Sequence, residues 1–438
     1  MKRLFAAVAA SVVSACAFAQ AALWRSDVPR HEFFRIPAII AYGDNIVAFS
    51  DNRSGVTDAT VWGDVGSVGN ISIEARYSTD RGRTWTEPRT VVTGFGTGSF
   101  DQSHGDAAVV RDRLSGRMLM MCASGTTGYG RSNATPADGY ATALRVGRYY
   151  SMDGGHTWNG RDVTADIYSI FNAPADGTPP AGVVRIFFAS GRICQSRTIK
   201  RGAYYRIYSA LTTNCGALVV YSDDFGATWH ALGGAAARPA PKGDESKVEE
   251  LPDGSVLLSC RMMGGRYFNV FRYADGADGG TWGEPVASTS VDDGTAAIEN
   301  ATNGDVLIVP ATGADGRKAF VALQSVPRGN NGEHPTNRER RSHVSIYWKA
   351  FADAAQMTAP SNWVGGWQRM EVTSGYSAYS TMNLCGDGSI AFIYEDNSVH
   401  FRLGSQFTEV YDIMFRNLTL DEITGGAYAY AAPKCCGR

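Results

Sequence analysis

This chain of 438 residues has little of several features that would assign it to common classes of protein. Its charges nearly cancel, with 41 Lys and Arg against 43 Asp and Glu, so nothing favours nucleic acid or an anionic membrane surface as a partner. After residue 19 no apolar run is long enough to span a bilayer. The 7 histidines are scattered without an H-E-x-x-H pattern, and the cysteine spacings form no zinc motif. The sequence therefore implies neither a metal nor an organic cofactor.

Glycine and aromatic residues are what the chain has in abundance. It contains 50 glycines, and aromatic residues make up 11% of the sequence. This combination indicates many short strands joined by tight turns, not a helical protein. Hydrophobic residues reach 44%, which supplies a large core and excludes disorder as the overall state. No linker rich in proline or serine divides the chain, so residues 20–438 are predicted to form a single domain.

The first 19 residues are predicted to be a secretory signal peptide. Two basic residues precede an uncharged run over 4–19, which ends in a small-x-small pattern before Gln20. In a competing interpretation, the tetrapeptide ending at Cys16 is a bacterial lipoprotein box and Cys16 becomes the lipidated N-terminus. In both cases we expect an exported protein, secreted or periplasmic in the first. In the second it is an outer-membrane or cell-surface lipoprotein, and only then is a membrane a partner.

Seven cysteines remain beyond Cys16. An exported protein can oxidise its cysteines, and Cys194 with Cys215 is the best candidate for a disulfide because these residues flank one predicted loop. The alternative is that the cysteines are buried free thiols, which pack like small apolar residues.

A short pattern, Ser-x-Asp-x-Gly-x-Thr-Trp, recurs along the chain. It is complete at 78–85 and 151–158, appears at 222–229 with Asp224 in the acidic place, and is degenerate at 279–282. Each copy follows a strand-like stretch and is therefore predicted at a hairpin turn. There the Asp accepts hydrogen bonds from turn amides, the Gly takes a positive φ and the Trp packs between neighbouring sheets. We interpret these copies, known as Asp boxes, as structural elements and not as catalytic ones.

The spacing of the boxes predicts a ring of repeated units. Asp80, Asp153 and Asp224 lie 73 and 71 residues apart, and a period of about 70 divides residues 20–438 into about six units. The predicted fold is all-β, a six-bladed β-propeller of four-stranded antiparallel sheets. Residues 97–143 and 192–215 are predicted to be long insertions between strands, and helical periodicity is confined to 350–357 and 420–424. The strand candidates are 46–50, 72–77, 118–123, 144–150, 183–189, 217–221, 256–261, 305–310, 344–349 and 389–394.

Short motifs outside the boxes follow one another in order along the chain. They are Phe34-Arg35-Ile36-Pro37, Asp51-Asn52-Arg53 followed by Asp58, Asp244-Glu245, Cys260-Arg261, Arg341-Ser342, Ser377-Ala378-Tyr379 and Tyr394-Glu395. With the boxes, this set resembles the bacterial exo-α-sialidase (neuraminidase) family over nearly the whole of residues 20–438. The resemblance implies a retaining hydrolysis that releases terminal sialic acid from sialylated glycoproteins, glycolipids and oligosaccharides.

The resemblance also implies an arginine triad, formed by Arg35, Arg261 and Arg341, that binds the carboxylate of sialic acid. Three guanidinium groups give charge-assisted, partly bidentate hydrogen bonds that lysines would not supply. A buried arginine cluster needs anions around it, and Glu395 is expected to neutralise and orient Arg35.

For the nucleophile, the resemblance implies Tyr379. A carboxylate nucleophile would be repelled by the carboxylate of the substrate, whereas tyrosine is neutral until it attacks, and sialidases are an exception among glycosidases in this respect. Glu245 is expected to take the phenolic proton. Tyr376 is the rival candidate for the nucleophile.

Asp58 is expected to protonate the leaving oxygen and then to activate water, with Asp51 and Asp64 as alternatives. Its distance from Arg53 matches the family pattern. Arg53 is expected to contact the substituents of the sugar ring. Asp106, in His104-Gly105-Asp106, resembles a position that contacts the N-acyl or 4-hydroxyl side of the sugar.

Two other functions share some of these residues. A trans-sialidase or an intramolecular trans-sialidase would use the same tyrosyl intermediate and pass it to a sugar acceptor or to a hydroxyl of the substrate itself. A propeller that binds sialosides without catalysis would need the boxes, but it would not need the catalytic set.

Overall fold

The computed structural model describes residues 20–53, 71–95, 100–274, 279–299, 302–330, 340–403 and 406–432. The predicted signal peptide, including Cys16, lies outside the described residues. So do the predicted acid/base residue Asp58 and its alternative Asp64.

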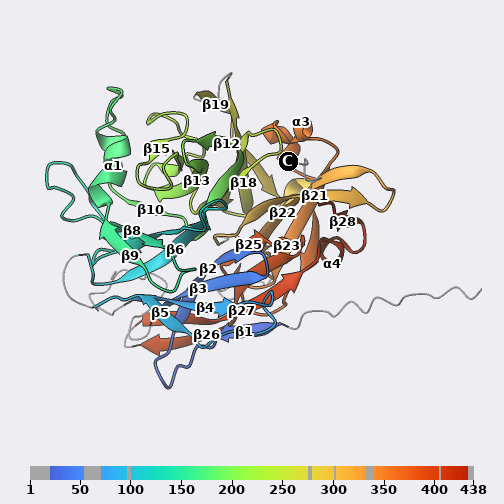
Figure 1. Ribbon diagram of the computed structural model, residues 1–438, viewed down its shortest axis with the longest axis horizontal. Coiled ribbons are helices and arrows are strands. Elements are labelled where there is room, and N and C mark those ends of the chain that lie inside the picture. The colour runs from blue at the N-terminus through green and yellow to red at the C-terminus, as the bar shows by residue number, and fades with distance from the viewer. Residues whose placement is uncertain are drawn as a thin grey trace, which may run out of the picture.

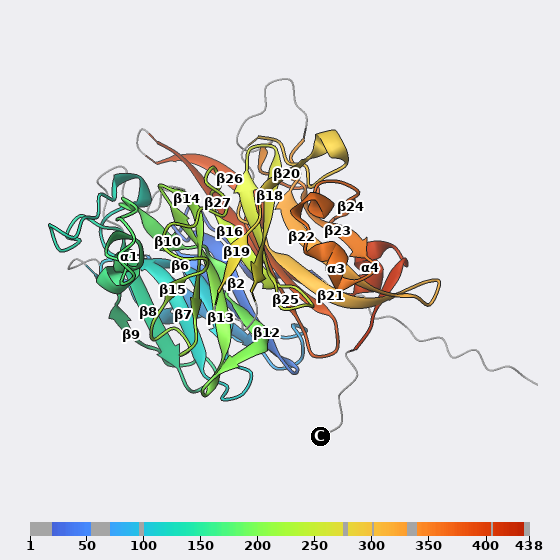
Figure 2. The ribbon, with the colours of Figure 1, turned by 90° about the horizontal axis from the view of Figure 1, so that it is seen from above.

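The described strands form five sheets, and the eight-stranded sheet among them comprises two joined blades, so six blades surround one axis, as the propeller prediction requires (Figures 1 and 2). The first blade consists of β2 (Phe34–Tyr42), β3 (Asn45–Asn52), β4 (Ser72–Ser78) and β5 (Arg89–Val92). The second consists of β6 (His104–Arg111), β7 (Met118–Ser124), β8 (Arg145–Ser151) and β9 (Asn159–Asp162), with β11 (Gly191–Arg192) parallel to β6. The third consists of β10 (Ile186–Phe188) and β12 (Cys194–Arg201), which both pair with β13 (Tyr204–Thr213), then β14 (Gly216–Ser222) and β15 (His230–Ala231).

The fourth, fifth and sixth blades complete the ring. The fourth consists of β16 (Ser246–Glu250), β17 (Val256–Met262) and β18 (Gly265–Tyr273), with β19 (Gly280–Trp282) and β20 (Val286–Thr289) both paired to β18. The fifth consists of β21 (Val306–Gly313), β22 (Lys318–Pro327), β23 (Val344–Phe351) and β24 (Gln368–Glu371), with β28 (Tyr428–Tyr430) beside β21. The sixth consists of β25 (Ser380–Leu384), β26 (Ile390–Leu403), β27 (Gln406–Leu418) and β1 (Ala21–Trp24).

Both ends of the described chain contribute to ring closure. The strand β1 pairs antiparallel with β27, so the sixth blade combines strands from the start and the end of the sequence. The pairing of Phe34 with Tyr411 then joins β2 to β27 and links the sixth blade to the first. The inner strand β2 contacts both β6 and β25, which places the first blade between the second and the sixth.

The first Asp box forms the predicted hairpin turn. Asp80 accepts hydrogen bonds from the backbone N–H of Thr84 at 2.9 Å and from its hydroxyl at 2.6 Å. Gly82 has a φ of +85°, and Trp85 donates its indole N–H to the Gly82 carbonyl at 3.0 Å. The Trp85 ring packs edge-on against Phe415 of the sixth blade, with 5.0 Å between centroids. The predicted structural role of this box is confirmed.

The second and third boxes repeat the carboxylate contacts, through Asp153 and Asp224. Trp158 of the second box packs against Phe49 of the first blade, again between neighbouring sheets. Trp229 of the third box instead packs against Phe188, which belongs to the same blade.

Each of the ten predicted strand segments overlaps an observed strand, but the two predicted insertions are wrong. Residues 97–143 contain β6 and β7, and 192–215 contain β12 and β13. The sequence of β12, Cys-Gln-Ser-Arg-Thr-Ile-Lys-Arg, is polar and only partly buried, so its hydrophobic alternation is too weak to identify a strand.

The helices lie outside the blades. The helix α4 (Leu420–Thr424) confirms one prediction, while α3 (Ala354–Met357) covers only part of the other because β23 extends to Phe351. The helix α1 (Thr164–Asn172) was not predicted: it is short and its N-cap residue, Val163, provides no side-chain cap. It lies across the molecule from α3 and α4 (Figures 1 and 2). Short 3-10 turns occur at Tyr129–Arg131, Ser290–Asp292 and Pro360–Trp363. None of the helices in the described ranges combines the length and apolar character that crossing a membrane requires.

The predicted disulfide between Cys194 and Cys215 is wrong, and both residues are free thiols. Cys194 pairs with Tyr208 in the β12–β13 ladder, whereas Cys215 follows Thr213 in the turn at the far end of β13. Five residues of strand separate these two ends by roughly 17 Å, and a disulfide requires Cα atoms within about 7 Å of each other.

Candidate active site

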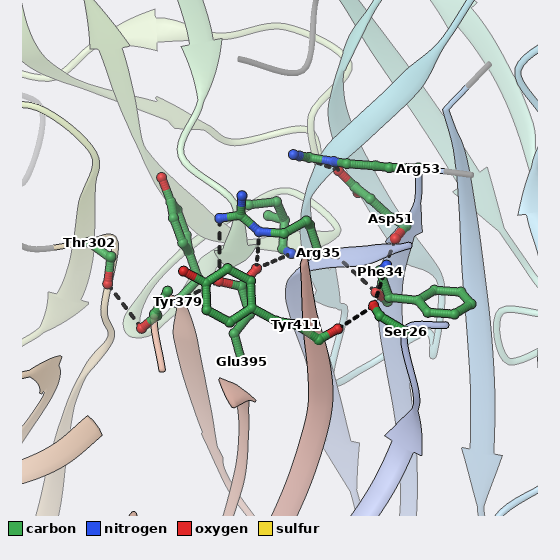
Figure 3. Close-up of polar contacts among 12 residues, drawn as sticks. Ser26, Phe34, Arg35, Asp51, Arg53, Thr302, Tyr379, Glu395 and Tyr411 are labelled. Carbon is green, nitrogen blue, oxygen red and sulfur yellow. Dashed lines mark hydrogen bonds and ion pairs between the residues drawn. The ribbon is translucent and has the colours of Figure 1, made fainter. Parts of the chain in front are cut away.

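Six of the predicted site residues come together where the inner strands of several blades begin. They are Arg35, Glu245, Arg261, Arg341, Tyr379 and Glu395. They come from the first, fourth, fifth and sixth blades or from the residues just before them. Figure 3 shows Arg35, Tyr379 and Glu395 around a common centre, with Arg53 and Asp51 on one side.

A β-bulge turns the first of these side chains toward the axis. The pairing of β2 with β3 is irregular between Arg35 and Ala38, and Ile36 has a φ of +54°. Positive φ values recur at Asp106 and at His343, two residues after Arg341. Bulges and left-handed residues concentrate where a side chain must be redirected, and here each lies at or within two residues of a predicted site residue.

Glu395 is the anchor of this arrangement and is fully buried. Its Oε1 accepts hydrogen bonds from Arg35 Nε at 2.8 Å and from the Ile36 backbone N–H at 2.8 Å. Its Oε2 accepts from Arg35 Nη2 at 3.4 Å and from the Tyr379 backbone N–H at 3.0 Å (Figure 3). The carboxylate therefore neutralises a buried guanidinium and also ties it to the backbone of Tyr379.

Tyr379 contacts a carboxylate and a guanidinium at the same time. Its hydroxyl donates to Glu245 Oε1 at 2.9 Å, and Arg261 Nη1 donates to the Tyr379 oxygen at 3.4 Å. The same Arg261 nitrogen bonds Glu245 Oε2 at 2.7 Å, so the three side chains form a closed triangle. Because all three are less than a tenth exposed, these contacts operate with little screening by solvent.

Burial raises the pKa of Tyr379 well above its usual value, and the Glu245 carboxylate raises it further. Arg261, Arg341 and Arg35 act in the opposite direction. The phenol is consequently neutral near neutral pH. It can act as a nucleophile only if its proton leaves as the new bond forms, and Glu245 is in hydrogen-bonding contact to accept it.

Three guanidinium groups surround the Tyr379 side chain. The guanidinium carbons of Arg35 and Arg341 lie 5.4 and 5.9 Å from the ring centroid, and Arg261 reaches the hydroxyl. Arg341 is held close because its carbonyl accepts a 2.8 Å hydrogen bond from the N–H of Ser377, two residues before Tyr379. This group of three cations can bind an anion with the planar, charge-assisted geometry of arginine.

The rival tyrosine, Tyr376, occupies a different position. It forms an isolated β-bridge with Ser342 and is only partly buried. The hydrogen bond to Glu245 is made by Tyr379.

Arg53 and Asp106, the predicted contacts to sugar substituents, form a second group beside the first. Asp51 Oδ2 accepts from Arg53 Nε at 3.2 Å and from Nη2 at 2.8 Å. The backbone N–H of Asp106 donates to both oxygens of Asp51, at 3.0 and 3.1 Å. Asp51 pairs with Arg35 across the β2–β3 ladder, which joins the two groups.

Sequence reasoning did not identify Tyr411 as part of the site. Its ring lies 4.9 Å from the guanidinium carbon of Arg35, so Arg35 is sandwiched between two tyrosines (Figure 3). Tyr411 lies in the middle of β27, where a buried aromatic residue is ordinary in a sheet, so no local signal distinguishes it. In the described ranges, no group of three or more His, Cys, Asp or Glu residues is placed to hold a metal ion.

Comparison with known proteins gives consistent matches. Residues 66–390 match the family model described as a BNR repeat-like domain. A sialidase from Paraclostridium sordellii is 26% identical over 84% of this chain and 82% of its own length. A sialidase from Micromonospora viridifaciens is 34% identical over 52% of this chain, a match that spans only 32% of that protein.

A solved structure of the leech intramolecular trans-sialidase, complexed with 2,7-anhydro-Neu5Ac, superimposes on this chain with a TM-score of 0.64. The match covers 93% of this chain and 71% of the other, at 16% identity. At that identity the likeness shows a shared fold, the six-bladed propeller.

Proposed function

We propose that this chain, which belongs to the BNR repeat-like family and is similar to sialidases, is a retaining exo-α-sialidase acting on sialylated glycoconjugates. One observation carries the proposal: the Tyr379 hydroxyl donates a hydrogen bond to Glu245, and three arginines surround the tyrosine. A propeller that only binds glycans has no need of a buried tyrosine paired with a base.

Substrate binding follows from the charges. Sialic acid carries its carboxylate on the anomeric carbon, so an arginine triad that holds this carboxylate also places the reacting carbon. Arg35, Arg261 and Arg341 are the proposed triad, and Glu395 keeps Arg35 oriented before substrate arrives. The fixed orientation reduces the reorganisation needed to bind and react.

The reaction is proposed in two steps. In the first, Tyr379 Oη forms a bond to the anomeric carbon, its proton passes to Glu245, and Asp58 protonates the departing glycosidic oxygen. In the second, Asp58 takes a proton from water, whose oxygen attacks the anomeric carbon, and Tyr379 leaves and recovers its proton from Glu245. Two inversions at one carbon give net retention.

A transferase is the second candidate function. The tyrosyl intermediate would then be captured by a sugar hydroxyl in place of water, with the same residues. The fold shared with an intramolecular trans-sialidase supports keeping this candidate.

Export of the chain is also a proposal, supported by the N-terminal pattern of residues 1–19. Mass spectrometry of the mature protein tests it. A chain beginning at Gln20 supports plain cleavage, whereas a lipidated Cys16 supports the lipoprotein. An intact Met1 contradicts both.

A proton NMR time course of the purified protein with sialyllactose tests the proposed reaction. Early appearance of free sialic acid as the α-anomer supports hydrolysis with retention. An anhydro sugar or a new sialoside formed first supports the transferase. A folded protein that leaves sialyllactose unchanged contradicts both enzymatic functions.

A further inference from the structure

We propose that Asp51 is a positioning residue that locks Arg53 and Asp106 into one rigid contact surface for the ring substituents of the bound sugar. This inference rests on the proposed function, because it concerns the same substrate. The inference gives Asp51 a positioning role, whereas the sequence made Asp51 an alternative to Asp58 as the acid/base.

The guanidinium of Arg53 is anchored along one edge. Asp51 Oδ2 accepts from both Nε and Nη2, at 3.2 and 2.8 Å. Because the guanidinium is planar and rigid, fixing this edge fixes the direction of the third nitrogen, Nη1. In the described part of the chain Nη1 makes no hydrogen bond, although Arg53 is only 1% exposed. A buried donor without a partner is unusual in a native protein, and here it supplies a hydrogen bond for a ligand.

The same carboxylate holds the backbone of Asp106. The Asp106 N–H donates to Asp51, and Asp106 has a φ of +53°, a left-handed conformation that few residues other than glycine adopt. The pairing of β6 with β7 is irregular between Gly105 and Ala108, so no regular ladder holds this segment. Asp51 supplies the missing restraint, and it brings the Asp106 carboxylate to 3.6 Å from Arg53 Nη2.

The approach of Asp51 to the second blade depends on Gly105. A Cβ atom at position 105 would lie 2.6 Å from Asp51 Oδ2, which is closer than van der Waals contact allows. Asp51 itself is completely buried, so it has no surface with which to meet a substrate. Its effect on a sugar must therefore pass through Arg53 and Asp106.

The test compares Asp51→Asn with Asp223→Asn. The control removes the charge from another Asp–Arg pair, in which Asp223 accepts two 2.7 Å hydrogen bonds from Arg206 on the third blade. Steady-state kinetics are measured with an aryl sialoside and with its 4-deoxy analogue. We expect Asp51→Asn to raise KM roughly ten-fold or more with a smaller change in kcat, and to alter the preference between the two substrates. Asp223→Asn should leave KM and the substrate preference at the wild-type values.

A double-mutant cycle with Arg53→Ala separates positioning from a general loss of structure. If Asp51 acts through Arg53, the effect of Asp51→Asn shrinks in the Arg53→Ala background. An effect of full size in that background, or a KM and preference equal to those of Asp223→Asn, overturns the inference. If Asp51→Asn does not fold, Gly105→Ala displaces the same carboxylate and must shift KM and preference in the same direction.

The outcome is separable from that of the proposed function. If the wild type binds sialic acid without turnover, the dissociation constants of the same variants for sialic acid, measured by calorimetry, replace KM. The inference then stands on a weaker affinity of Asp51→Asn. A wild type that neither turns over nor binds sialosides overturns both proposals.

Discussion

The hydroxyl of Tyr379 donates a 2.9 Å hydrogen bond to Glu245, 134 positions earlier in the chain. Tyr379 lies just before β25 of the sixth blade, and Glu245 lies just before β16 of the fourth. The inner strand β21 of the fifth blade contacts both of these strands. The contact therefore bridges the fourth and sixth blades across the start of the fifth, and it exists only when these three blades pack side by side.

Replacing Tyr379 with Phe tests the proposed nucleophile. Without the phenolic oxygen no covalent intermediate can form, while the arginines remain to bind the carboxylate. We expect kcat with an aryl sialoside to fall by on the order of 10³-fold or more, and the dissociation constant for sialic acid to change little. Tyr376→Phe is the matched control. If Tyr376→Phe abolished turnover and Tyr379→Phe did not, the nucleophile would be Tyr376.

Replacing Glu395 with Gln removes the charge that compensates Arg35. Both side chains are nearly inaccessible to solvent, so the substitution removes a buried negative charge from beside a buried guanidinium. We expect the free energy of unfolding to fall by about 3–5 kcal/mol, measured by denaturation in urea. Glu371→Gln removes a half-exposed partner of Arg369 and should change stability by less than about 0.5 kcal/mol. Equal effects of the two substitutions would contradict the anchoring role of Glu395.

The pH dependence of KM should report the protonation of Asp51. Burial raises the pKa of Asp51 to about 7. The positive charge of Arg53 opposes this rise, and the negative charge of Asp106 adds to it. Among the described residues, the titratable and charged groups facing it are Arg53, Asp106 and the buried thiol of Cys122. As the pH falls through about 7, Asp51 takes up a proton and its charge-assisted bonds to Arg53 weaken, so KM should rise. In Asp51→Asn this inflection should be absent, and its persistence there would assign it to another group.

Acid should weaken the first Asp box in a defined range. Burial by itself would raise the pKa of Asp80. Hydrogen bonds from Thr84 and Ser78 outweigh that effect and lower the pKa to about 2, below the ordinary 3.8. Because folding lowers the pKa of this carboxylate, its ionised form stabilises the folded protein above pH 3.8, and this stability is lost as the pH falls through 2. We expect the urea midpoint of the wild type to fall more steeply over this range than that of Asp80→Asn. Parallel curves for the two proteins would show that the box does not contribute in this way.

The repeats and the strands could be predicted because their causes are local. In each box the Asp bonds a Thr four residues later and the Trp follows directly, so eight residues contain the whole turn. Weakly patterned elements such as β12 and α1 could not be predicted, because contacts with other elements stabilise them. The proposed disulfide failed for a related reason: whether Cys194 meets Cys215 depends on the strand pairing between them.

The sequence by itself determined the turn chemistry, the repeat period and, apart from Tyr411, the charged and aromatic side chains proposed for the site, since all of these are written in residue type and spacing. Only the tertiary structure decided which side chains meet. Closure of the ring brings Arg35 of the first blade to Tyr379 of the sixth, and packing of the fourth and fifth blades adds Arg261 and Arg341. It also packs Tyr411 against Arg35 and brings the Asp106 N–H to the Asp51 carboxylate. Such contacts join residues far apart in the chain, and burial gives them their strength, because a charge or hydrogen bond removed from water is screened much less.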